Sequence, residues 1–211
     1  MKPLSIIALT WLGALLAMPA AANDQQLYDP APPADGAFVR VLNAQSGSEQ
    51  TASIGDAKYT KLAYPAISPY QVVKQGAQTF KAGNIRPSLT IEAGKYYTIA
   101  VTQQGSVVTL KDAIIENPSK AYVYFYNFSD IPKASLHATK QNVDIIANVS
   151  PQNGQHREMN ALTVDMAITH EGKTVQAFPA VELKRRAGVS FVLVGQADAA
   201  KAIMAKNDIK R

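Results

Sequence analysis

Residues 37–43 read AFVRVLN and residues 121–127 read AYVYFYN, so one pattern occurs twice in the chain. Each stretch alternates its side chains with period two, is rich in Val, Phe and Tyr, and ends at an asparagine. This composition and this alternation are typical of a β-strand that stops at a turn. The two stretches therefore predict two related strands, one in each half of the protein.

A second pair of similar segments closes each half. Residues 89–101 and residues 181–194 both place an apolar stretch on either side of a short glycine-containing turn. We expect each of them to be a hairpin that pivots on its glycine. The repeat predicts two tandem β-modules, residues 37–116 and residues 117–211, joined near the Asn-Pro-Ser sequence at 117–119.

The remaining sequence fits the same fold class. Short segments rich in β-branched and aromatic residues lie between Gly, Pro, Asn and Ser, which is the spacing of a β-sandwich or barrel. The clearest expected strands are 38–43, 70–74, 88–91, 96–102, 107–111, 122–128, 161–169, 181–184 and 190–194. Only residues 198–206 favour a helix. The sequence thus predicts an all-β chain of two tandem β-sandwich modules.

The beginning of the sequence has the pattern of an export signal. Lys2 precedes an apolar run, and three alanines at 20–22 form a small-residue cleavage site. We expect a signal peptide over residues 1–22, cleavage after Ala22, and a periplasmic location. Residues 23–36 are polar and rich in proline, so an extended segment is expected there.

Composition and charge exclude several classes of protein. The chain has no cysteine, which removes disulfides, thiolate nucleophiles and Cys-ligated metals. Basic and acidic residues balance over 23–116, whereas 117–211 has a basic excess concentrated towards its end. A basic surface suits an anionic polymer or an acidic partner, although a solvated tail explains it equally. Nucleic acid is a poor partner for an exported protein.

A search for catalytic chemistry finds no motif. Gly-x-Ser-x-Gly, phosphate-binding glycine loops and metal-ligand spacings are absent, and the three histidines, His137, His156 and His170, are far apart in sequence. We therefore predict no catalytic residue, no cofactor and no metal ligand.

Two local features suggest binding. Tyr122, Tyr124 and Tyr126 share one face of an expected strand, where they form either a sugar-stacking platform or part of a buried strand. With the basic turn Lys184, Arg185 and Arg186, they are the candidate polymer-binding residues. Exposed loops on rigid sandwiches commonly carry partner contacts. The candidate partner-binding residues are Ser68, Pro69, Tyr70, Gln155, His156, Arg157, Glu158 and Asn160.

Several short segments, taken in order, resemble the AlgF family of alginate O-acetylation accessory proteins. They are LYDP at 27–30, GAFVRVLNA at 36–44, SPY at 68–70, GKYYT at 94–98 and GQHREMN at 154–160. No single segment is specific, but their order and spacing hold across nearly the whole chain after residue 22. The resemblance is weak beyond residue 195.

The resemblance implies a non-catalytic periplasmic protein required for O-acetylation of a secreted exopolysaccharide, alginate first and cellulose as the other candidate. It further implies partners: a membrane-bound O-acyltransferase and periplasmic serine-esterase-like acetyltransferases, which the protein links. The alternative is a polysaccharide-binding module that presents an anionic polysaccharide to the acetyltransferase. A third reading is an enzyme that accepts acetyl groups covalently on a serine or threonine.

Overall fold

The computed structural model describes residues 33–47 and 49–210 of the chain. The expected signal peptide, residues 1–22, and most of the expected extended segment 23–36 lie outside the described residues. Apart from the short 3-10 helix η2 (Ala197–Ala199), every element in the described residues is a β-strand, so the all-β prediction is confirmed. The described part contains no helix that is long and apolar enough to span a membrane.

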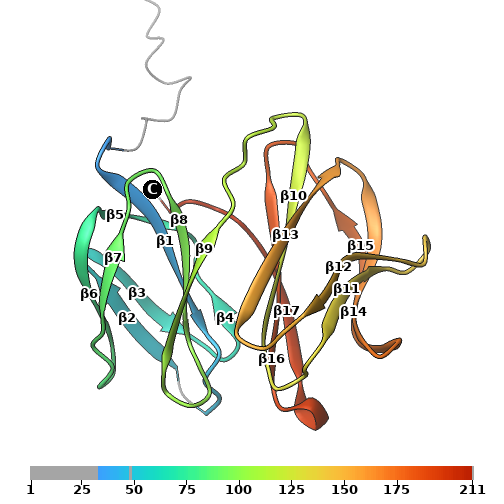
Figure 1. Ribbon diagram of the computed structural model, residues 1–211, viewed down its shortest axis with the longest axis horizontal. Helices are drawn as coiled ribbons and strands as arrows, with labels where there is room; N and C mark the ends of the chain where they lie inside the picture. The colour runs from blue at the N-terminus through green and yellow to red at the C-terminus, as the bar shows by residue number, and fades with distance from the viewer. Residues whose placement is uncertain (1–32, 48, 211) are drawn as a thin grey trace, which may run out of the picture. The chain divides into compact units, whose positions relative to one another are not determined.

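The strands divide between the two halves of the chain (Figure 1). The first module contains β1 (Gly36–Asn43), β2 (Gln50–Ile54), β3 (Ala57–Leu62), β4 (Ala66–Ile67), β5 (Gln71–Lys74), β6 (Gly76–Ala82), β7 (Ser88–Ile91), β8 (Tyr96–Val101) and β9 (Val107–Asp112). The second module contains β10 (Lys120–Ser129), β11 (Ala134–Ala138), β12 (Val143–Val149), β13 (Asn153–Asn160), β14 (Thr163–His170), β15 (Lys173–Glu182), β16 (Gly188–Gly195) and β17 (Lys201–Lys206).

Both modules pair their strands in the same topology. The first forms the sheets β4-β1-β8-β9, with β5 also paired to β1, and β3-β2-β6-β7. The second forms β13-β10-β16-β17 and β12-β11-β14-β15. In each module the opening strand runs parallel to the last strand but one, β1 to β8 and β10 to β16. The repeat seen in the sequence is thus a repeat of sheet topology.

Alternation along the two matching strands builds three separate cores. Val39 and Val41 of β1 lie in the core of the first module, and Val123 and Phe125 of β10 lie in the core of the second. The opposite faces of these strands share a third apolar cluster, to which β1, β8, β10 and β16 all contribute. We call the two sheets that meet there, β4-β1-β8-β9 with β5 and β13-β10-β16-β17, the inner sheets. The other two are the outer sheets.

The two glycine-centred hairpins expected at 89–101 and 181–194 are wrong. β7 pairs with β6 in the outer sheet, whereas β8 pairs with β1 and β9 in the inner sheet. In the second module β15 pairs with β14, and β16 pairs with β10 and β17. Each glycine segment therefore carries the chain from one sheet to the other. The flanking strands bury their apolar side chains in one shared core without pairing to each other.

The helix expected over residues 198–206 is also wrong. Only Ala197–Ala199 is helical, and β17 follows it as an edge strand antiparallel to β16. The segment is rich in Ala and Lys, which favour a helix locally. Pairing with the open edge of β16 outweighs that preference, since Ile203 then packs into the shared apolar cluster.

The asparagine that ends each matching strand has a structural role beyond a turn. Asn43 and Asn127 are fully buried. The Asn127 side-chain nitrogen donates to the carbonyls of Ile131 and Val149, at 2.8 and 2.9 Å. Its side-chain oxygen accepts from the backbone nitrogen of Ser129 at 3.0 Å. The Asn43 amide makes the corresponding contacts, donating to Leu62 and accepting from Gln45.

Replacing Asn127 with alanine is expected to destabilise the fold. The change leaves two buried carbonyls and one buried amide without their partner, and each loss costs about 1–3 kcal/mol before relaxation. We expect Asn127→Ala to lower the free energy of unfolding by about 2–4 kcal/mol in urea titrations. Asn153→Ala, at an exposed position at the start of β13, is the control and is expected to be nearly neutral. Equal effects of the two substitutions would contradict this role.

Candidate functional site at the junction of the two modules

The two inner sheets meet through a mixed apolar and aromatic surface. Leu42 and Ala100 of the first module pack in one cluster with Tyr122, Tyr126 and Val192 of the second. All five are buried. A contact of this composition resembles a domain core, so the junction is a fixed part of the fold.

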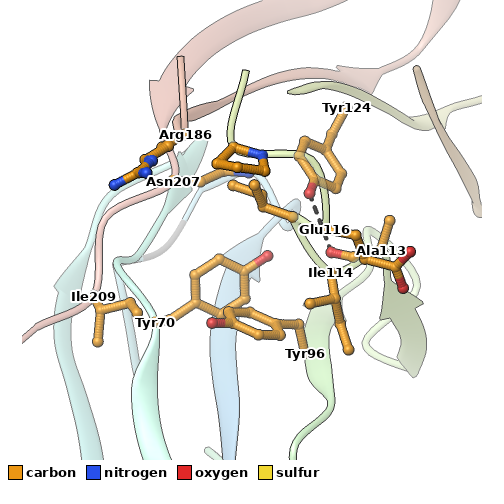
Figure 2. Close-up of a pocket in the computed structure, with 11 residues that line it drawn as sticks. Tyr70, Tyr96, Ala113, Ile114, Glu116, Tyr124, Arg186, Asn207 and Ile209 are labelled. Atoms are coloured by element: carbon orange, nitrogen blue, oxygen red, sulfur yellow. Dashed lines mark hydrogen bonds between the residues drawn. The ribbon is translucent and has the colours of Figure 1, made fainter. Parts of the chain in front are cut away.

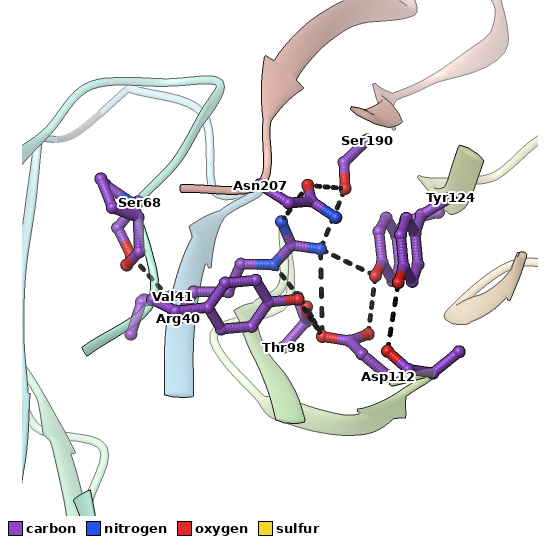
Figure 3. A network of polar contacts seen from close by, with 12 residues as sticks. Arg40, Val41, Ser68, Thr98, Asp112, Tyr124, Ser190 and Asn207 are labelled. Atoms are coloured by element: carbon purple, nitrogen blue, oxygen red, sulfur yellow. Dashed lines mark hydrogen bonds and ion pairs between the residues drawn. The ribbon is translucent and has the colours of Figure 1, made fainter. Parts of the chain in front are cut away.

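A buried arginine lies in the middle of this junction. Arg40 of β1 is only 1% exposed, and its guanidinium hydrogen-bonds to groups of both modules (Figure 3). Within its own module Nε donates to the Thr98 hydroxyl at 2.9 Å. Across the junction its terminal nitrogens donate to Asn207 Oδ1 at 2.8 Å, Tyr126 at 2.8 Å and Ser190 at 3.0 Å. This one side chain therefore joins β1 to β10, β16 and the segment after β17.

The negative partner of Arg40 is Asp112, at the end of β9. The closest nitrogen and oxygen atoms are 3.9 Å apart, so the pair is bridged by hydroxyls. Thr98 accepts from Arg40 and donates to Asp112 Oδ2 at 2.6 Å. Tyr126 likewise accepts from Arg40 and donates to Oδ1 at 2.6 Å. A buried charge needs such a complete set of partners to offset its desolvation.

The repeat places similar groups on the two sides of the junction but not identical ones. Thr98 lies beside Arg40 in β8, and Ser190 lies beside Tyr124 at the same register in β16. Thr98 donates to Asp112, and Ser190 donates to Asn207 at the same distance of 2.6 Å. The charged pair thus lies in the first module, and the second module supplies neutral counterparts.

Tyr122, Tyr124 and Tyr126, singled out as polymer-binding residues, are buried at this junction. Their exposures are 2, 3 and 2%, so their rings offer no open face for a sugar, and the prediction of a stacking platform is wrong. Their hydroxyls instead hold the chain that leaves β9. Tyr124 donates to the carbonyl of Ala113 at 3.1 Å, and Tyr122 accepts from the backbone nitrogen of Asn117 at 2.9 Å.

The segment 154–160, expected to be a partner-binding loop, is the edge strand β13. Its side chains alternate between two faces, one towards the junction and one towards the second module. Gly154 lies so close to Tyr126 that a Cβ would be 2.5 Å from the ring. Glu158 accepts from the Tyr122 hydroxyl at 2.6 Å, and His156 lies beside the Tyr124 ring. These three face the junction.

Arg157 and Met159 of β13 face the second module. Arg157 donates to the carbonyl of Ile145 on β12 at 2.9 Å, which ties the two edge strands together, and Met159 packs on the second core. Asn160 accepts from the Lys120 amine at 2.8 Å. Gln155, His156, Arg157, Glu158 and Asn160 remain exposed, so the strand still offers a surface.

The Ser68-Pro69-Tyr70 segment was also expected to be exposed, and only Pro69 is. Ser68 accepts from the backbone nitrogen of Val41 at 2.9 Å, and Tyr70 donates to Asp112 at 2.8 Å. For the two buried residues, direct partner contact is therefore excluded in this structure.

The residues beyond β17 cross back to the first module. Ile209 bridges Tyr70, whose backbone nitrogen and oxygen bond to Asp208 and Lys210. The basic tail envisaged from the sequence is thus fixed in place through residue 210 in the described part of the chain. Its backbone joins the same junction as Arg40.

A cavity of about 450 Å³ opens at the junction beside these residues (Figure 2). Tyr70 and Tyr96, whose rings meet edge to face at 5.1 Å, form one wall. Arg186 and Glu116 also line it. The cavity brings together Tyr70, which the sequence analysis assigned to partner binding, and Tyr124 and Arg186, which it assigned to polymer binding. Lys184 and Arg185 of the same turn lie outside the lining, and Lys184 pairs with Glu182 at 3.3 Å.

Tyr70, Tyr126 and Arg40 at the junction are each held in one protonation state. Burial raises the pKa of the Tyr126 and Tyr70 phenols well above their usual value, so both stay protonated. For Arg40, burial acts to lower the pKa, but the contacts with Tyr126, Tyr70 and Asp112 outweigh it and the pKa is raised. These groups are suited to holding two modules together rather than to proton transfer at neutral pH.

The three histidines do not form one cluster. His137 on β11 contacts Asp144 at 2.8 Å, His170 contacts the carbonyl of Lys133 at 3.0 Å, and His156 lies on β13. His137 and His170 line a second cavity of about 610 Å³ on the second module. Within residues 33–47 and 49–210, no three His, Asp or Glu side chains converge as a metal site would require.

Sequence reasoning did not find the central residues of the junction, Arg40, Asp112 and Asn207. One signal for Arg40 was present. An arginine in the middle of AFVRVLN interrupts an otherwise apolar strand, and a buried charge at such a position requires partners. The partners themselves come from five distant segments, which no local pattern connects.

Tyr126→Phe tests the hydroxyl bridge without changing the packed ring. The substitution removes one acceptor from Arg40 and one donor from Asp112 inside the junction. We expect a loss of about 1–3 kcal/mol in unfolding free energy. Tyr96→Phe, which alters a half-buried tyrosine outside the bridge, is the control. Equal stability of Tyr126→Phe and the native protein in urea denaturation would contradict the importance of the bridge.

Comparison with known proteins identifies the family. A family model described as "Alginate O-acetyl transferase AlgF" matches residues 10–190. The alginate biosynthesis protein AlgF of Pseudomonas syringae pv. tomato is 26% identical over 192 residues, which is 91% of this chain and 86% of that protein. The protein of the same name from Pseudomonas aeruginosa is 27% identical over 194 residues, with 92% and 89% covered.

A solved structure of the C-terminal domain of AlgF from P. aeruginosa also matches. It is 27% identical in sequence, aligns with a TM-score of 0.39, and covers 42% of this chain and 98% of that domain. The family model itself spans both modules up to β16. This chain therefore belongs to the AlgF family.

Proposed function

We propose that this protein is a non-catalytic accessory component required for O-acetylation of a secreted exopolysaccharide, with alginate as the first candidate and cellulose as the second. The observation that carries the proposal is the family match over residues 10–190, together with relatives named as alginate biosynthesis proteins. In this role the protein links a membrane-bound O-acyltransferase with periplasmic serine-esterase-like acetyltransferases. Its own location is the periplasm, supported by the export pattern of residues 1–22.

The family description names an acetyltransferase, whereas we propose that turnover belongs to the partners. The support lies in how the polar residues of this chain are used. The buried Arg40, Asp112 and Tyr126 are saturated with contacts to one another, and the phenols are held protonated. Acyl transfer by a serine needs a base beside the nucleophile and donors for the oxyanion. The hydroxyls nearest these groups, Thr98 and Ser190, are engaged in the junction.

An adaptor needs rigid surfaces at fixed separation, and the junction supplies the rigidity. β13 is the surface we favour for a partner, because it is an edge strand whose residues are exposed over most of its length. Edge strands offer unpaired backbone groups and are a common place for another chain to add. Arg157 covers part of this edge by its bonds to β12, and Gln155 is an exposed residue of the strand with no side-chain contact to β12 among those described.

The alternative function, presenting the polysaccharide itself, no longer has the tyrosine row as support. The exposed turn Lys184, Arg185 and Arg186 remains available to an anionic polymer. This basic turn is only three residues long, and Lys184 is already paired with Glu182. The adaptor role is therefore the one we place first.

Deleting the gene in frame is the direct test of the proposed role. We expect the secreted polymer to lose its acetyl groups while its yield persists, because the proposed role concerns acetylation only. Acetyl content is measured by proton NMR on purified polymer, which also identifies the sugar as uronate or glucose. A plasmid copy of the gene is the control and should restore acetylation. Unchanged acetylation in the deletion strain would refute the proposal.

Photo-crosslinking tests the β13 surface. A crosslinking amino acid at Gln155 is expected to capture the membrane O-acyltransferase or one of the esterase-like acetyltransferases in living cells. The same amino acid at Thr174, exposed on the outer sheet of the second module, is the matched control. Mass spectrometry identifies the captured protein. Capture of these enzymes equally from both positions, or from Thr174 alone, would rule out β13 as the docking edge.

A further inference from the structure

Two exposed isoleucines meet at the junction cavity. Ile114 is 37% exposed and Ile209 is 44% exposed, and both line the cavity of about 450 Å³. Figure 2 shows the rings of Tyr70 and Tyr96 between these two side chains. A single exposed isoleucine is ordinary on a protein surface, but two of them beside one aromatic hollow mark a candidate interaction site.

The apolar surface continues from the cavity along the inner sheet of the first module. Tyr96 of β8 stacks on Phe38 of β1 with ring centroids 4.4 Å apart, and Phe38 pairs with Val72 of β5. Side chains of directly paired residues lie on the same face of a sheet. Val72, which is also exposed, therefore extends the apolar surface towards β5.

Hydrogen bonds inside the junction hold the walls of the cavity in place. On one side, the carbonyl of Ala113 accepts from the Tyr124 hydroxyl at 3.1 Å, which fixes the chain just before Ile114. On the other side, the two residues that flank Ile209 bond to the backbone nitrogen and oxygen of Tyr70 at 2.8 and 2.7 Å. A binding site that is formed in advance spares the cost of ordering it when a ligand enters.

Two charged side chains lie on opposite sides of the cavity, Arg186 and Glu116 (Figure 2). Both are exposed, and within residues 33–47 and 49–210 neither takes part in a salt bridge or a side-chain hydrogen bond. Asp208 and Lys210, which flank Ile209, are exposed as well and have opposite signs. The cavity thus has a basic side at Arg186 and an acidic side at Glu116, with apolar walls between them.

The cavity adjoins the β13 surface. A neighbouring hollow of about 430 Å³ shares Ala113, Ile114 and Glu116 with the cavity and reaches His156 and Glu158 of β13. A partner that lies along β13 can therefore place a side chain in the cavity without leaving the surface of the protein.

An apolar hollow with charges at its rim matches the anatomy of a protein interface. The centre of such an interface is apolar and closely packed, and a polar rim surrounds it. A hydrated polysaccharide offers no apolar group large enough to fill these walls. A peptide segment does, because a large side chain can contact Tyr96 and the isoleucines while its neighbours in the segment meet the charges of the rim.

We propose that this cavity anchors a protein partner by receiving one aromatic or branched aliphatic side chain of an extended segment. In that segment a carboxylate on one side of the anchor contacts Arg186, and a basic group on the other side contacts Glu116. The proposal rests on the proposed function, since the partner is expected among the acetyltransferase components. It deepens that function by naming the chemical feature of the partner that is recognised.

Binding of purified components tests the proposal. The probes are the periplasmic esterase-like acetyltransferases and the detergent-solubilised membrane O-acyltransferase of the same organism, each applied to the immobilised protein in biolayer interferometry. We expect at least one of them to bind. Ile114→Ser and Ile209→Ser together are expected to weaken that binding at least about tenfold, because truncating the central apolar contacts of an interface commonly has an effect of this size.

Two matched controls accompany these variants. Met204→Ser removes a similarly exposed apolar side chain from the face of β17 opposite Ile203, and we expect it to leave binding unchanged. Arg186→Gln is expected to weaken binding about two- to fivefold, and less at high salt. Arg185→Gln, next to it in sequence but outside the lining of the cavity, is expected to have no effect. Circular dichroism melting shows whether each variant is folded.

Several results would overturn the proposal. Unchanged binding by the folded double isoleucine variant, or equal weakening by Met204→Ser, would show that the partner does not use the cavity. Absence of binding by the native protein to every component would have the same meaning. Sedimentation velocity covers another occupant: a native dimer that dissociates in the double isoleucine variant would assign the cavity to a second copy of this chain.

The outcome is separable from that of the gene deletion. If deletion abolishes acetylation but a gene carrying both isoleucine substitutions restores it fully, the accessory role stands and the anchor site is wrong. If binding depends on the two isoleucines but acetylation persists in the deletion strain, the anchor site is real and the accessory role is wrong.

Discussion

The guanidinium of Arg40 is the interaction on which the arrangement of the two modules depends. An isolated charge buried at this depth is strongly unfavourable, and removing one partner of a buried pair costs about 3–5 kcal/mol. Arg40 is tolerated because five groups from both modules surround it, four as hydrogen-bond acceptors and Asp112 as counter-ion. Three of those groups, on Tyr126, Ser190 and Asn207, belong to the second module and reach Arg40 only when the inner sheets are in contact. The charge therefore favours one arrangement of the modules over any looser one, in addition to the apolar burial around it.

The segments that carry the family resemblance are largely those that build this junction. The glycine of GQHREMN makes room for the Tyr126 ring, and its glutamate holds Tyr122. The tyrosine of SPY reaches Asp112, and AFVRVLN contains Arg40 itself. The segments shared with the family therefore contain residues that hold the two modules together. It does not by itself mark the surface that meets a partner, which explains why several residues first assigned to binding are found in structural contacts.

Much of the fold could be predicted from the sequence, because alternation and turn residues are local signals. The two matching strands and their opposite cores follow from Val39 and Val41 on one face and Leu42 on the other. Strand pairing is not local, so the crossings at Gly94 and before Gly188 were mistaken for hairpins. Strands with few apolar residues, such as β3 and β13, were missed because their outward sides are polar.

Matching positions of the two modules hold different residues, Arg40 in β1 and Tyr124 in β10. This difference has a consequence for the evolutionary origin of the two-module chain. The two residues hold the same register in equivalent strands of repeated modules. Two separate identical copies meeting through these sheets would place the same residue on both sides, and a pair of arginines would bring like charges together in a dry interface. Once both copies are encoded in one chain, each position can change alone. Duplication followed by fusion thus permits a charged residue on one side and neutral acceptors on the other, a combination unavailable to a homodimer.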